Sequence, residues 1–130
     1  MGPGALAADA APGCDWTVAA TWEFFPLDDE AFPAVRLARR AGSLGGTAPA
    51  AMNAADEACV EAFLAGRLPF DRIVPTVAAV LDEHLDGRAA ATCPWVEGNA
   101  TTLDDVLSTD AWARTRAGEL VDAMAEVSRG

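Results

Sequence analysis

Apolar and polar positions near the start of the chain alternate with the period of a β-strand. From residue 16 to residue 24 every second side chain is apolar, and small or polar residues stand between them. Such a two-residue period places the apolar side chains on one face of an extended segment. It predicts a strand over 16–25 that ends at Pro26, since proline lacks the N–H group needed for a ladder hydrogen bond.

Beyond residue 28 the apolar positions recur every three or four residues, which is the period of an amphipathic helix. Thr47 is the expected N-cap of the second helix and Asp71 that of the third, in which Pro75 predicts an irregular first turn. Residues 86–101 carry turn signals and predict a long loop, anchored by Trp95 and Val96. The expected helices cover residues 31–42, 48–65, 72–84 and 108–127, with a separate helical turn at 102–105.

These elements predict a mainly α fold, a small four-helix bundle preceded by one N-terminal β-strand. A length of 130 residues fits one domain. We divide the chain into a disordered tail at 1–14, a strand and linker at 15–26, and the helical bundle at 27–130. A single strand leaves its backbone groups and its tryptophan-rich face unpaired, so we expect it to need an external partner. That partner is a second copy, giving a homodimer, or a separate protein.

The net charge of the chain excludes some classes of binding partner. Nine basic and twenty acidic residues give a net charge of −11, which repels phosphate backbones and anionic lipid headgroups. We therefore expect no nucleic acid and no membrane partner. The first thirteen residues lack the basic start of a signal peptide, and three well-separated cysteines match neither a disulfide framework nor a zinc site. The expected location is the cytoplasm.

The predicted second helix carries three polar residues among alanines, namely Asn53, Asp56 and Glu57. Spacings of three and four residues place them on one helical face. One hypothesis is an acidic site, with Asp56 and Glu57 as general acid and base or as metal ligands. The alternative, which we favour, is a solvated face or a hydrogen-bonded contact with another part of the protein. Two carboxylates on one helix identify no metal, and we assign none.

Three further residues are candidates for chemistry or binding. His84, the sole histidine, is suited to carry a proton near neutral pH, although an exposed position at a helix C-terminus is the interpretation we favour. Trp16 and Trp22, together with Asn53, are candidates for binding a small apolar molecule. Packing in a core or an interface is the favoured role of both tryptophans, because they lie on the apolar face of the predicted strand.

Three blocks of sequence occur in an order that resembles one family. They are TWEFFPLDDEAFPAVRLARRAG, NAADEACVEAFLAGRLPF and TLDDVLSTDAWAR, and the resemblance runs over residues 15–127. The family is the C-terminal part of 1-deoxy-D-xylulose 5-phosphate reductoisomerase, and the second block resembles its NAANE helix, with Asp56 in place of the second Asn. The resemblance implies a helical bundle that packs on a catalytic part. In this family the full-length enzyme uses NADPH and a divalent metal to make 2-C-methylerythritol 4-phosphate in isoprenoid precursor synthesis.

The sequence lacks the motifs that the resemblance assigns to catalysis. GSLGG at 42–46 lies between two expected helices and not in the strand-to-helix turn of a dinucleotide site. The stretch from Asp82 to His84 lacks the serine of the family's metal-binding motif, and the chain has no lysine. We therefore expect no cofactor here, since NADPH and the metal belong to the missing family domains.

Two functions remain open at this point. The first is a C-terminal domain, split off or standing alone, that lacks the catalytic machinery and acts by packing on or assembling with a separate catalytic chain. The second is a repurposed homologue that binds a small apolar molecule in a groove between the helices and the tryptophan strand, and catalyses a cyclisation or isomerisation.

Overall fold

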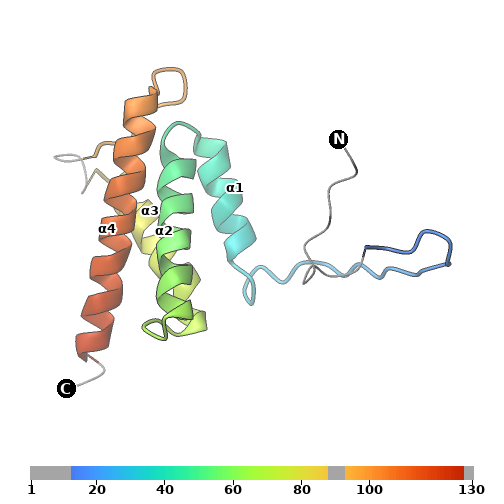
Figure 1. Ribbon diagram of the computed structural model, residues 1–130. Coiled ribbons are helices and arrows are strands. Elements are labelled where there is room, and N and C mark those ends of the chain that lie inside the picture. The colour runs from blue at the N-terminus through green and yellow to red at the C-terminus, as the bar shows by residue number, and fades with distance from the viewer. Residues whose placement is uncertain (1–12, 88–92, 128–130) are drawn as a thin grey trace, which may run out of the picture.

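The computed structural model describes residues 13–87 and 93–127. Its regular elements are all helical: α1 (Ala34–Leu44), α2 (Ala48–Leu64), the short 3-10 helix η1 (Phe70–Arg72), α3 (Ile73–Leu85) and α4 (Leu103–Val127). Figure 1 shows the four α-helices lying alongside one another as a bundle. The predicted mainly α fold with four helices is therefore confirmed for this part of the chain. Within the same residues, no helix combines the length and apolar character that crossing a membrane requires.

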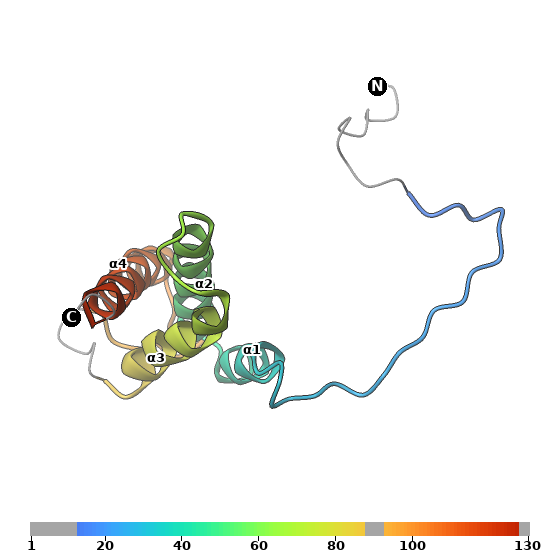
Figure 2. The same ribbon diagram turned by 90° about the horizontal axis from the view of Figure 1, so that it is seen from below.

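The central helix is α2, which packs against α1, α3 and α4. Its buried positions are alanines and Cys59, and such small side chains let the neighbouring helices approach closely. Larger side chains from those neighbours then fill the core at the close packing typical of protein interiors. Figure 2 shows α2, α3 and α4 grouped together, with α1 on the outside beside α2 and α3. The largest fully buried aliphatic residues are Val77, Val80, Leu81 and Val121.

Residues 13–32, here called the arm, extend away from the helices without forming a strand (Figures 1 and 2). The predicted strand over 16–25 and its need for a partner are therefore not confirmed. A strand forms only where a neighbouring strand pairs with its backbone, and the described helices offer none. The expected division of the chain stays a prediction, and residues 1–12 of the expected tail lie outside the described residues.

Helix α4 is one continuous helix of 25 residues, so the prediction of a separate turn at 102–105 was wrong. Thr102 and Asp105 cap each other at its start. The Asp105 N–H donates to Thr102 Oγ1 over 3.2 Å, and the Thr102 N–H donates to Asp105 Oδ2 over 2.9 Å. No glycine or proline follows before residue 118. The helix therefore runs on from the capped turn.

The start of α3 is irregular, as Pro75 predicted, because the 3-10 turn η1 precedes the first α-helical turn. Asp71 lies inside that 3-10 turn, and neither η1 nor α3 has a side-chain cap at its start. The predicted N-cap role of Asp71 was therefore wrong.

The chain after residue 92 is fastened to the start of α2 by a pair of hydrogen bonds, which we call the clasp. The Thr47 N–H donates to the Val96 carbonyl over 3.1 Å, and the Val96 N–H donates to Thr47 Oγ1 over 3.1 Å. Trp95 Nε1 donates to the Gly45 carbonyl over 3.4 Å. The predicted anchoring by Trp95 and Val96 is thus confirmed. Thr47 is the N-cap residue of α2, as predicted, but its side chain makes no cap hydrogen bond within the helix.

Gly46 allows this close approach. Its φ is +58°, and a Cβ at this position would overlap the Val96 carbonyl oxygen and lie 2.9 Å from the carbonyl carbon. Only glycine combines a positive φ with the missing side chain that the clasp requires.

Candidate functional site

Asn53 and Glu57 lie one turn apart on α2 and meet Arg114 of α4. Asn53 Nδ2 donates to Glu57 Oε1 over 3.1 Å, and the Arg114 guanidinium donates to the other oxygen of Glu57. Arg114 Nε also donates to Asp110 Oδ2 over 2.8 Å. Hydrogen bonds from Arg114 and then Asn53 lower the pKa of Glu57, while Asp110 and Glu57 together raise the pKa of Arg114. Glu57 is therefore held as a carboxylate that links α2 to α4, which is unsuited to a general acid.

Asp56 lies on a different side of α2. With Asn53 it lines a hollow of about 250 Å³ whose other wall is formed by Ala38, Ala41 and Gly42 of α1. Burial, assisted by the charge of Asp56, raises the pKa of the Cys59 thiol to about 11. A thiol of such high pKa is a poor nucleophile at neutral pH. Asp56 and Glu57 both stand on α2, but Asp56 borders the hollow against α1 whereas Glu57 contacts Arg114 of α4.

His84 is fully buried, so the favoured expectation of an exposed histidine was wrong. The last turn of α3 is covered by the clasp and by α4. His84 Nε2 and Thr47 Oγ1 share a hydrogen bond of 2.9 Å, and the Trp112 ring lies 5.5 Å from the imidazole between centroids. Burial lowers the pKa of His84, against a weaker opposing effect of the Cys93 backbone. The imidazole is therefore neutral at neutral pH and supports the clasp.

Trp16 and Trp22 stand on the arm, where 88% and 66% of their surfaces are exposed. They form no wall beside Asn53, and no hydrogen bond of the described residues joins Asp56 or Glu57 to His84. The candidate site residues are thus distributed over the arm, the α1–α2 hollow, the α2–α4 surface and the buried end of α3. Within residues 13–87 and 93–127, no three His, Cys, Asp or Glu side chains are grouped so that they could hold a metal ion.

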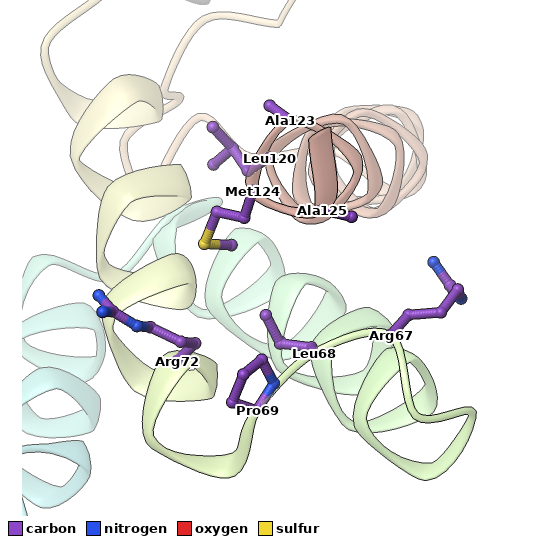
Figure 3. Close-up of a pocket in the computed structure, with 8 residues that line it drawn as sticks. All are labelled: Arg67, Leu68, Pro69, Arg72, Leu120, Ala123, Met124 and Ala125. Carbon is purple, nitrogen blue, oxygen red and sulfur yellow. The ribbon is translucent and has the colours of Figure 1, made fainter. Parts of the chain in front are cut away.

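The structure has a different concave surface that the sequence analysis missed. A pocket of about 450 Å³ opens between the α2–η1 connection and the last turns of α4 (Figure 3). Leu68 and Pro69 face Leu120 and Met124 across it, while Arg67 and Arg72 stand at its two sides. The apolar residues of AGRLPF could have indicated a binding surface after the second helix. The pocket itself forms only because α4 packs beside these residues.

An exposed apolar surface adjoins the pocket. Phe63, Leu64 and Phe70 are 37%, 77% and 74% exposed, and the two phenylalanine rings meet edge to face with centroids 5.6 Å apart. We call these three residues and the pocket the α2–η1 end of the bundle. Apolar surface concentrated in this way is typical of a binding surface.

Comparison with known proteins agrees with the resemblance read from the sequence. The family model of the DXP reductoisomerase C-terminal domain matches residues 4–116. The chain is 62% identical over 112 residues to the 1-deoxy-D-xylulose 5-phosphate reductoisomerase of Kitasatospora griseola, an overlap of 86% of this chain and 27% of that protein. It is 56% identical over 114 residues to the enzyme of Cutibacterium acnes, covering 86% of this chain and 28% of that protein.

A third relative, the enzyme of Mycobacterium leprae, is 52% identical over 109 residues, which are 83% of this chain and 25% of that protein. The chain therefore spans about a quarter of the length of these relatives. With the family model matching most of its residues, the chain belongs to the family of DXP reductoisomerase C-terminal domains.

Proposed function

We propose that this chain acts as the helical C-terminal domain of a reductoisomerase and works by packing on a catalytic part. The observation that carries this proposal is the arm, whose aromatic side chains are exposed although they follow the pattern of a buried strand face. A free protein rarely leaves so much contiguous apolar surface in water. Membership of a C-terminal domain family that spans a quarter of its relatives agrees with this role.

The state of the candidate catalytic groups supports packing as well. Glu57 is held by Arg114 and Asn53, and His84 is buried against Thr47. Both groups stabilise contacts between helices. Conversion of 1-deoxyxylulose 5-phosphate, with NADPH and a divalent metal, is then the activity of the assembled protein, to which this domain contributes no catalytic side chain.

In the assembly the arm pairs as a strand with a sheet edge of the catalytic part. Pairing would satisfy its backbone groups and bury the face that carries Trp16, Trp22 and Phe24. Burial of an aromatic side chain of this kind contributes about 1.5–3 kcal/mol. Three of them offset a substantial part of the roughly 4–15 kcal/mol that association costs in lost freedom.

A chimeric enzyme tests the proposal. The matched C-terminal segment of the Kitasatospora griseola reductoisomerase is replaced by this chain, and turnover is followed by NADPH oxidation with 1-deoxyxylulose 5-phosphate. We expect an active chimera that loses most of its activity on Trp22→Asp. Thr21→Asp is the matched control on the opposite face of the arm and should have a small effect. An inactive chimera, or equal effects of both substitutions, would contradict the proposal.

A second candidate is a free-standing homodimer that binds a small apolar molecule, and the pocket of about 450 Å³ favours it because ligand sites are mostly apolar and of this size. Here two arms pair with each other. Light scattering of the isolated chain distinguishes the two. A dimer that persists on dilution and loses its stability with Val18→Pro supports the second candidate, whereas a monomer supports the first.

A further inference from the structure

We propose that the α2–η1 end is the surface of the bundle that docks on the catalytic part, with the pocket receiving an apolar side chain of that partner. This inference rests on the proposed function and adds to it the face of the domain that makes the contact.

The apolar residues at this end lie where helix ends and turns usually present polar groups. Leu64 is the last residue of α2 and Phe70 opens η1, and about three quarters of each side chain faces water. Between them Leu68 is only 3% exposed and forms the base of the pocket. Exposed anchors beside a preformed apolar cavity are the features that concentrate binding energy at protein interfaces.

The position of the arm indicates which molecule covers the α2–η1 end. Pro33 and Leu37 at the start of α1 share a hollow of about 260 Å³ with Val74 and Ala78 of α3. The arm therefore leaves the bundle at the end where α3 begins, which is the end that carries η1 (Figure 1). About three quarters of each relative lies outside the matched C-terminal segment, so the chain of those proteins enters the bundle through the segment that corresponds to the arm.

A local turn orders the last part of the arm, directly before α1. Asp28 Oδ1 accepts hydrogen bonds from the N–H groups of Glu30 and Ala31, each of 3.0 Å, and the Asp28 carbonyl accepts one from the Phe32 N–H over 2.9 Å. Phe32 is thereby presented at the start of α1 with 64% of its surface exposed. A partner joined through the arm thus meets apolar side chains from both the turn and the α2–η1 end.

The charges beside the pocket indicate the chemistry of the contact. Arg67 and Arg72 flank an apolar cavity in a protein of net charge −11, and the ion pair of Arg67 with Asp122 is long, at 3.8 Å. The surface fits an apolar side chain of the partner with carboxylates on either side. Such exposed charge pairs add little affinity but fix orientation.

Hydrogen exchange measured by mass spectrometry tests the inference on two intact proteins, the isolated chain and the chimera. We expect amides of residues 64–72 to exchange at least tenfold more slowly in the chimera. Residues 103–107 are the matched control, because Leu103 and Leu107 are 72% and 58% exposed at the opposite end of the bundle. Their exchange should be the same in both proteins.

Substitution gives a second readout. The pair Leu64→Gln and Phe70→Gln should return the exchange of residues 64–72 in the chimera to the rate of the isolated chain. The pair Leu103→Gln and Leu107→Gln should leave it slow. All four positions are exposed, so neither pair should unfold the isolated chain, and its circular dichroism checks this.

The outcomes separate the two proposals. An active chimera without slower exchange at 64–72 overturns the docking surface and leaves the proposed function standing. An inactive chimera with an unprotected arm contradicts the proposed function. Slow exchange at 64–72 in the isolated chain that is lost on dilution identifies a second copy as the occupant, and this result also overturns the inference.

Discussion

Replacing Gly46 by alanine should destabilise the bundle much more than the same replacement at Gly66. The two glycines have similar backbones, with φ values of +58° and +72°. They differ in their surroundings. A Cβ on Gly46 would overlap the Val96 carbonyl oxygen, whereas a Cβ on Gly66 has no neighbour within 4 Å. The pair therefore separates the cost of a positive φ from the cost of disrupting the clasp.

The magnitudes follow from these surroundings. Alanine at a left-handed position costs about 1–2 kcal/mol, and we expect this loss for Gly66→Ala. In Gly46→Ala the Val96 backbone must also move, which disturbs both hydrogen bonds with Thr47. Each is worth about 0.5–1.5 kcal/mol when made, and leaving the polar groups of buried Thr47 unpaired costs more. Together these losses should lower the free energy of unfolding of Gly46→Ala by about 3–4 kcal/mol.

Urea unfolding of the isolated chain, followed by circular dichroism at 222 nm, measures both losses. For a small domain the free energy of unfolding falls by about 1–3 kcal/mol per molar urea. An extra loss of about 2 kcal/mol thus lowers the midpoint of Gly46→Ala by roughly 1 M relative to Gly66→Ala. Equal midpoints with unchanged slopes would refute the reasoning, because the clasp would then add nothing beyond the backbone strain.

Two further changes test the core and the buried histidine. Because burial lowers the folded-state pKa of His84 below its ordinary value of 6.5, the unfolded state binds more protons as the pH falls below about 6.5. The free energy of unfolding should therefore decrease toward acid, by at most about 1.4 kcal/mol per pH unit, and His84→Gln should flatten this decrease in urea titrations between pH 7 and 5. Leu81→Ala should lower the free energy of unfolding by about 2–5 kcal/mol because the side chain is fully buried. Leu64 is 77% exposed, so Leu64→Ala should change the free energy of unfolding of the isolated chain by less than about 0.5 kcal/mol. Equal shifts of the melting temperature in the two variants would contradict the assignment of Leu81 to the core.

The helices could be predicted from the sequence because their signals are local. The three- to four-residue period, Gly66 and Pro75 fixed the second and third helices to within a residue or two. The first helix runs two residues past the expected end at Gly42 and stops before Gly45, whose φ is +65°. Glycine inside a helix lowers its stability without ending it, so composition alone did not show which glycine would be the stop.

Contacts between distant residues could not be predicted in the same way. Thr47 and His84 each stand at a helix end, where a local role as cap or as a dipole partner accounts for either residue alone. Their hydrogen bond joins positions 37 residues apart and depends on how α3 crosses the start of α2. The same holds for Arg114, which meets Glu57 across 57 residues. These pairings depend on how the helices pack against one another. The apolar period within a single helix does not determine that packing.

The arm is the opposite case, because its sequence has the apolar pattern of a β-strand although residues 13–32 form no strand in the structure. A two-residue alternation lowers the free energy only if one face is buried and the backbone is paired, and neither condition is met in the arm. Exposing Trp16, Trp22 and Phe24 in a free chain adds nothing to its stability and favours aggregation. Burial of this alternating face therefore requires an apolar surface and a strand edge that the described helices do not supply.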